Sequence, residues 1–213
     1  MAALPPDYDS DPGRRGAWRA PQDVHEAVAP ELRGPVLDVG CGEGRLAANL
    51  GPGVRWVGVD SSPAQVAVNP HRPVVLADMR ALPFRDRSFA EVLHLWCLYH
   101  LDDPVEAVAE AARVLRPGGR YYASTAARTS DPELVPDDYP ASTFDAEDAE
   151  ALVASVFADA EAEHWDGTFF PLTTHEDVLA YCRHNSIPPE RADGLDLPLW
   201  LTKRGALVRA TKG

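Results

Sequence analysis

The segment DVGCGEG has glycines at positions 40, 42 and 44, directly after a short apolar run. Glycine lets the backbone approach a ligand where a side chain would collide, so this spacing at a strand end is suited to holding a nucleotide. A dinucleotide-binding turn has its third glycine one place later, where this chain has Arg45. Asp38 would also repel a diphosphate, but it would attract an ammonium or sulfonium group. The turn therefore favours a ligand with a positive charge; a plain strand-to-helix corner is the alternative.

Two further carboxylates end the next two apolar segments, VRWVGVD and VVLAD. Asp60 is placed to accept hydrogen bonds from ribose hydroxyls, and Ser61 beside it is assigned to the same site. Asp78 could accept a hydrogen bond from an adenine amino group while Met79 packs on the ring. Structural roles are the alternatives, because Asp60, Ser61 and Ser62 are all able to cap a helix. Together the acids describe one crevice for an adenosine with a cationic tail and no diphosphate.

These residues need a parallel sheet to bring them to one edge. Strands are predicted over 34–40, 54–60, 73–78, 90–96, 120–125, 161–170 and 206–212, with the last two as antiparallel neighbours at one edge. Helices are predicted over 21–32, 43–50, 62–68, 103–119, 145–160 and 174–184. Asp103 is the expected N-cap of the fourth helix, and Gly118 and Gly119 its stop. The alternation indicates an α/β fold with helices on both faces of a mostly parallel sheet.

The overall composition of the chain argues against several kinds of partner and site. The formal net charge of −13 argues against binding to nucleic acid or to an anionic membrane. Cys41, Cys97 and Cys182 are far apart in the sequence, so neither a metal site nor a disulfide framework is expected. We find no signal peptide and no apolar run of membrane-spanning length, and therefore expect a cytoplasmic protein with one domain over 1–213. The oligomeric state stays open.

The chain resembles the class I S-adenosylmethionine-dependent methyltransferases, in particular their small-molecule branch. The resemblance rests on VLDVGCGEG, VGVD, LADMRALPF, AEVLHLWCLYHLDDP and RVLRPGGRYYAST, in the order and approximate spacing of the family, and covers residues 36–125 best. It implies a doubly wound, Rossmann-like sheet of seven strands with the last strand antiparallel. It also implies S-adenosylmethionine as cofactor, a small-molecule methyl acceptor and no metal.

Carried over to this chain, the resemblance gives each candidate residue a role. Asp38 would lie near the amino end of the methionine, Asp60 on the ribose, and Asp78 with Met79 at the adenine. The residues passing under or flanking the methionine portion would be Gly40, Cys41, Gly42, Gly44, Leu95 and Trp96. Cys41 is expected to fill space rather than to act as a nucleophile.

The acceptor side is less defined. His94 and His100 bracket LWCLY, where a histidine could take a proton from an acceptor; packing in the sheet or lining the next turn is the alternative. Tryptophans 96, 165 and 200, with Tyr99, could wall an apolar pocket, although most large aromatic residues pack in cores. Residues 1–33 are expected to form an arm and helix that could act as a lid, and 126–144 and 166–204 to be variable segments near the acceptor.

We therefore expect a methyltransferase that moves a methyl group to a small molecule by in-line displacement. A noncatalytic protein that binds adenosylmethionine or a partner on the same fold is the first alternative. A nicotinamide-dependent oxidoreductase is the second, although Arg45 and Asp38 oppose it.

Overall fold

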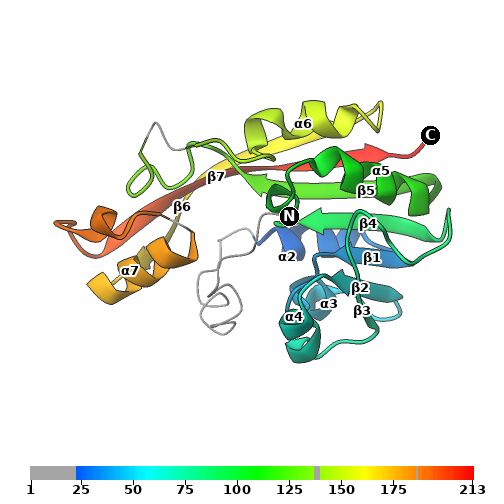
Figure 1. Cartoon of the computed structure of the whole chain (residues 1–213), viewed down its shortest axis with the longest axis horizontal. Coiled ribbons are helices and arrows are strands. Elements are labelled where there is room, and N and C mark those ends of the chain that lie inside the picture. The colour runs from blue at the N-terminus through cyan, green and yellow to red at the C-terminus, as the bar shows by residue number, and fades with distance from the viewer. Residues whose placement is uncertain (1–22, 137–139, 186) are drawn as a thin grey trace.

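Seven strands form one sheet in the order β3-β2-β1-β4-β5-β7-β6 (Figure 1). The structure is a computed structural model that describes residues 23–136, 140–185 and 187–213. The strands are β1 Val36–Val39, β2 Trp56–Asp60, β3 Val74–Leu76, β4 Phe89–Leu95, β5 Leu115–Ala126, β6 Glu161–Leu172 and β7 Leu199–Thr211. β1 to β5 pair in parallel, whereas β7 runs antiparallel to both β5 and β6. The predicted fold class is confirmed. Residues 1–22 of the expected arm lie outside the described residues.

Each predicted helical segment contains a helix. Two short helices, η2 and η3, lie outside these segments. The bounds of the described helices are α2 Val24–Val28, η1 Ala29–Glu31, α3 Arg45–Asn49, α4 Pro63–Val68, η2 Leu98–His100, α5 Pro104–Val114, α6 Ala146–Ala154, α7 His175–His184 and η3 Pro189–Ala192. Asp103 caps α5 as predicted, with its side chain accepting a hydrogen bond from the Val105 N–H. At α4, Ser62 is the cap, accepting from the Gln65 N–H.

The predicted stop of α5 at Gly118 and Gly119 is wrong. The helix ends at Val114, and β5 begins at Leu115. Pro117 lacks the N–H that a longer helix would need, and it disfavours helical conformation in the residue before it. The two glycines belong to β5 instead: the Gly118 N–H donates to the Lys212 carbonyl, and the Lys212 N–H donates to that of Gly119.

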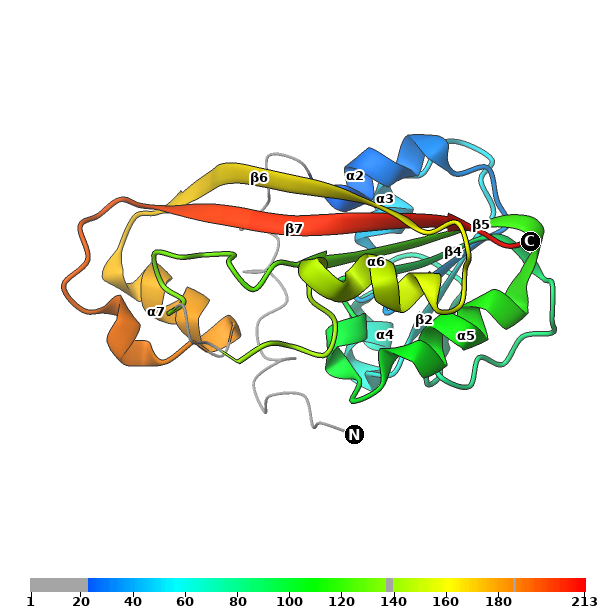
Figure 2. The same cartoon turned by 90° about the horizontal axis from the view of Figure 1, so that it is seen from above.

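Helices cover both faces of the sheet, which is why β1 is buried along its whole length. Figure 2 shows α2 and α3 on one side of the strands and α5 and α6 on the other. Residues of α5 and α6 pack with β1, β4 and β5 in one core cluster, and residues of α2 and α3 pack on the opposite face in a second. The two layers hold the carboxyl ends of β1 to β4 at one edge.

The β6–β7 hairpin runs past the end of the parallel strands (Figures 1 and 2). Gly205 pairs with Ala126, the last residue of β5, so residues 199–204 of β7 pair only with β6. A third cluster of buried side chains covers this overhang and includes residues of α7 and η3. We call this cluster, with α7 and η3, the C-terminal lobe. It stands on the side of the sheet toward which the parallel strands run.

Candidate functional site

The glycine turn after β1 has the backbone that its sequence predicts. Gly40, Gly42 and Gly44 all have positive φ, at 72°, 48° and 84°. A Cβ on Gly40 would lie 2.7 Å from the Cβ of Cys97, and one on Gly44 would lie 2.6 Å from Oδ1 of Asn69. At Gly42 the nearest atom would be 3.7 Å away, so this glycine faces more open space. Two of the glycines are therefore required by close packing as well as by conformation.

Asp60 and Asn69 hold the turn in place. The Gly42 N–H donates to Oδ2 of Asp60 at 2.8 Å, and the Ser62 N–H donates to Oδ1 at 2.9 Å. From the other side, Nδ2 of the buried Asn69 donates to the Gly42 carbonyl at 2.8 Å. Asp60 thus joins the turn to the start of α4, while Ser61 beside it is exposed. The role of Asn69 was not predicted, because a single asparagine after a helix matches no motif.

Asp38 is a buried residue of β1, two positions before Gly40, the first glycine of the turn. Its Oδ2 accepts a hydrogen bond of 3.2 Å from the indole Nε1 of Trp56. Burial raises the pKa of Asp38 to about 6; the nearby charge of His25 and the indole hydrogen bond oppose this shift, and the charge of Asp60 adds to it. Near neutral pH the carboxylate is charged but poorly solvated. A cationic group beside it would relieve that cost.

A second group of polar side chains lies at the start of α2 and includes His25, whose charge acts on Asp38. Asp23, the N-cap of α2, accepts hydrogen bonds from the backbone and Nδ1 of His25 and from Arg45. Burial would raise the pKa of Asp23, but the contacts with His25 and Arg45 outweigh it and hold the pKa at about 2. Arg45 stands where a dinucleotide-binding turn would have its third glycine, and its hydrogen bond to Asp23 connects it to the start of α2. No spacing in the sequence signals the link between Asp23 and Arg45.

The end of β3 lies beside the end of β2, as the topology requires. Asp60 pairs with Leu76, and the Ala77 N–H donates to the Asp60 carbonyl. Asp78 is half-exposed and forms an ion pair with Arg80 at 2.6 Å, whose hydrogen bonds lower the pKa of Asp78. Met79 is partly buried against the core. The structure therefore places Asp38, Asp60 and Asp78 at the ends of three adjacent strands.

The end of β4 brings aromatic residues to the same edge. Leu95 is buried, and Trp96 is half-buried with a positive φ of 62°. The Cys97 thiol donates to the Val39 carbonyl at 3.3 Å. The ring of Trp96 meets that of Trp165, on β6, with centroids 5.9 Å apart. Trp96 and Cys97 therefore link β4 both to the glycine turn and to the edge strand.

The two candidate histidines have different surroundings. His94 has no exposed surface, and its Nδ1 shares a 2.9 Å hydrogen bond with the Tyr121 hydroxyl. Burial lowers the pKa of His94 to about 3, so the ring is neutral near pH 7. His94 thus lies in the core, as the packing alternative has it, and not at the mouth of the crevice. His100 is half-buried at the end of η2, and burial also lowers its pKa.

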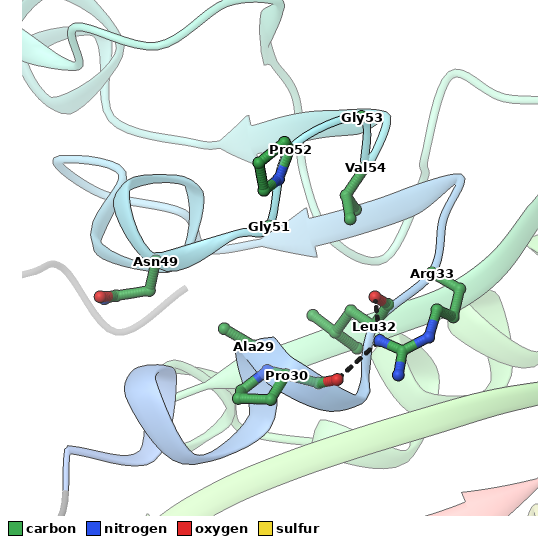
Figure 3. Close-up of a pocket in the computed structure, with 9 residues that line it drawn as sticks. All are labelled: Ala29, Pro30, Leu32, Arg33, Asn49, Gly51, Pro52, Gly53 and Val54. Carbon is green, nitrogen blue, oxygen red and sulfur yellow. Dashed lines mark hydrogen bonds between the residues drawn. The ribbon is translucent and has the colours of Figure 1, made fainter.

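A hollow of about 520 Å³ lies elsewhere, at the amino ends of β1 and β2 (Figure 3). It is lined by residues of 29–33 and 49–54, and the Arg33 guanidinium there turns back to donate to the carbonyls of Pro30 and Leu32. Ligands of parallel α/β sheets bind at the carboxyl ends of the strands. This hollow is therefore separate from the site described above.

Two findings concern the described part of the chain as a whole. Within it, no group of three or more histidine, cysteine, aspartate or glutamate side chains is arranged to hold a metal ion. No helix of these residues is long and apolar enough to cross a membrane.

Comparison with known proteins finds methyltransferases. Residues 37–123 match the family model described as a methyltransferase domain. Over 128 residues, 54% of this chain and 46% of the relative, the chain is 34% identical to methyltransferase GfsG of Streptomyces halstedii. Over 99 residues, 42% of this chain and 36% of the relative, it is 40% identical to a malonyl-[acyl-carrier protein] O-methyltransferase of Hahella chejuensis. The chain thus spans less than half the length of these curated relatives.

Solved structures agree in fold. The YcgJ protein of Bacillus subtilis superposes with a TM-score of 0.62 over 89% of this chain and 96% of that one, at 19% sequence identity. The family match runs from β1 into β5 and so contains the glycine turn and the ends of β1 to β4. The part of the chain that contains the glycine turn is therefore similar to a methyltransferase domain, and the fold is shared with solved structures such as the YcgJ protein.

Proposed function

We propose that this protein transfers a methyl group from S-adenosylmethionine to a small molecule. The observation that carries the proposal is the buried Asp38 carboxylate beside the glycine turn, with Asp60 and Asp78 at the next two strand ends. A buried carboxylate with a pKa of about 6 is suited to a ligand with positive charge. S-adenosylmethionine carries an ammonium and a sulfonium group and no phosphate.

Each of the three acids would bind a different part of the cofactor. Asp38 would neutralise the amino end of the methionine, Asp60 would accept hydrogen bonds from the ribose, and Asp78 would accept one from the adenine. A carboxylate oxygen accepts more than one hydrogen bond, so the Asp60 oxygens can serve the backbone of the turn and ribose hydroxyls together. Gly42 would let the ligand approach the backbone, with Cys41, Leu95 and Trp96 beside the methionine.

The cofactor supplies an activated methyl group: an acceptor lone pair forms a bond to the methyl carbon while the carbon–sulfur bond breaks and its electrons stay on sulfur. The protein would mainly align the acceptor and exclude water. Of the two histidines, His100 would be the one to take a proton from an acceptor that must lose one, because His94 is enclosed in the core whereas His100 is half-buried. Ser61 and Met79 would line the ribose and adenine ends.

Relatives support a small acceptor. Besides the malonyl-[acyl-carrier protein] O-methyltransferase, they include a demethylmenaquinone methyltransferase of Symbiobacterium thermophilum, 32% identical over 107 residues. The negative net charge of the chain also disfavours nucleic acid as the acceptor. Segments 126–144 and 166–204 would determine acceptor choice, because they lie at and beyond the end of β5.

Calorimetric titration with S-adenosylmethionine and with S-adenosylhomocysteine tests the proposal. We expect binding of both, and a loss of about a hundredfold in Asp60→Ala, because that change removes charge-assisted hydrogen bonds from ribose and turn. Asp86→Ala is the control: this carboxylate is 70% exposed and paired with Arg113. Its affinity should equal that of the unaltered protein.

Three results would redirect the assignment. A folded protein that binds neither ligand would refute the proposal. Binding of both without turnover over a broad panel of acceptors would favour a noncatalytic adenosylmethionine-binding protein. Reduction of a nicotinamide cofactor would favour the oxidoreductase.

A further inference from the structure

Trp96, the residue directly after β4, has an unusual backbone conformation. Its φ of 62° is in the left-handed region, which is strained for a bulky residue and persists only where the surroundings enforce it. The Trp96 N–H donates to the Ser124 carbonyl of β5 at 3.2 Å. The chain therefore turns sharply after β4 and fixes the direction of the indole ring.

The chain makes room for a second indole ring beside the first. Trp165 of β6 pairs with Gly205 of β7, and a Cβ on Gly205 would lie 2.3 Å from Cζ2 of Trp165. Gly205 is not one of the described glycines with positive φ, so space and not backbone conformation is the reason for glycine here. The Trp165 ring therefore lies across β7 and meets the Trp96 ring at an interplanar angle of 68°.

The pair of rings adjoins the glycine turn. Cys97, the residue after Trp96, occupies the space where Gly40 would carry a Cβ. Trp165 lies at the level of Ala126, the carboxyl end of β5, because both residues are aligned with Gly205. Both tryptophans are half-buried, and they lie at the carboxyl edge of the parallel strands, the edge at which the three acids also lie.

We propose that Trp96 and Trp165 form one wall of the acceptor site and that the acceptor carries a flat aromatic ring. Two rings fixed at a steep angle form a corner against which a third ring stacks on one face and meets an edge on the other. Such aromatic contacts add to the affinity beyond the apolar area that they bury. This inference rests on the proposed function, since it names the substrate class for the same site.

Fluorine NMR of protein labelled with 5-fluorotryptophan tests the wall without any need for turnover. The chain has five tryptophans, whose signals are assigned by single Trp→Phe variants. With S-adenosylhomocysteine saturating, the protein is titrated with 2-naphthol and, separately, with its saturated counterpart decahydro-2-naphthol. We expect 2-naphthol to shift the Trp96 and Trp165 signals and to bind about tenfold more tightly than the saturated alcohol.

A matched pair of variants separates the wall from general hydrophobicity. Trp165→Leu should weaken 2-naphthol binding about tenfold and leave the affinity for S-adenosylhomocysteine within about a factor of two. Glu163→Ala is the control, because Glu163 lies on the same strand as Trp165, outside the segments proposed to determine acceptor choice, and its side chain is 70% exposed. It should change neither affinity.

The inference is overturned if S-adenosylhomocysteine binds while 2-naphthol shifts neither signal, if the saturated alcohol binds equally well, or if Glu163→Ala loses as much affinity as Trp165→Leu. Absence of S-adenosylhomocysteine binding would instead refute the proposed function. The titration of the unaltered protein decides the matter by itself if Trp165→Leu does not fold.

Discussion

At the scale of single residues, the role proposed for Asp38 would make cofactor binding depend on pH. Its pKa of about 6 in the unliganded protein means that most molecules carry a protonated Asp38 at about pH 5 and a carboxylate at about pH 7.5. Only the carboxylate attracts a cation. We therefore expect the affinity for S-adenosylmethionine to rise about tenfold between about pH 5 and pH 7, and to change little above that.

Calorimetry across this pH range, beside the Asp38→Asn variant, measures the effect. The asparagine amide has no charge to lose, so the variant should bind weakly with little slope. The charges of His25 and Asp60 also act on Asp38: the first favours the carboxylate and the second opposes it. An affinity that falls with rising pH would contradict the role given to Asp38.

At the scale of elements, the site is built by joining the ends of strands and helices. α4 contributes through Asn69, its C-cap residue, which is 1% exposed and bonds to the Gly42 carbonyl. Asn69→Ala would leave that carbonyl and the His71 N–H without these partners, at a cost of about 1–3 kcal/mol. We expect a matching loss of stability and a cofactor affinity about tenfold lower.

Asn49→Ala is the matched control for Asn69. Asn49 also ends a helix and donates to a backbone carbonyl, that of Arg45, at 2.9 Å, but it is exposed and does not contact the turn. Its loss should change the free energy of unfolding by less than about 0.5 kcal/mol. Urea denaturation and calorimetry compare the two; equal effects would show that Asn69 does not support the turn.

The strand ends were predictable from the sequence, and the supports behind them were not. The apolar runs that contain Asp38 or end at Asp60 and Asp78 predict strands, because hydrophobic pattern and turn residues act locally. Asn69 and the pair of Asp23 with Arg45 depend on contacts between segments that no local pattern specifies. The same reason explains the wrong end predicted for α5, where pairing of Gly118 and Gly119 with Lys212 extends β5 backwards.

At the scale of the whole molecule, we expect the buried Asp38 carboxylate to lower the free energy of unfolding. The pKa of Asp38 is about 6 in the folded protein, against 3.8 for an unperturbed aspartate, so the folded protein binds the proton more tightly than the unfolded chain does. The free energy of unfolding therefore falls as pH rises from about 4 to 6 and stays lower above that, by roughly 3 kcal/mol at most. Asp38→Asn keeps an acceptor for the Trp56 indole and removes the charge.

We expect Asp38→Asn to raise the free energy of unfolding at about pH 7.5 by about 1–3 kcal/mol, and the gain to shrink toward about pH 4. Urea denaturation at both pH values measures it. Asp78→Asn, at a half-exposed position paired with Arg80, should give no such gain. A destabilised Asp38→Asn would mean that the carboxylate contributes more to the fold than its burial costs.

The position of β7 has a consequence for synthesis. β7 lies between β5 and β6 and is made after every other strand of the sheet. Among the described strands, β6 pairs with β7 alone, so it has no partner while the ribosome is still adding residues 199–211. The helices α7 and η3 of the C-terminal lobe follow β6 in the chain, so they also cannot pack against β7 until it has been made. The first five strands, which carry the glycine turn and all three acids, can associate earlier, and the C-terminal lobe is therefore completed last.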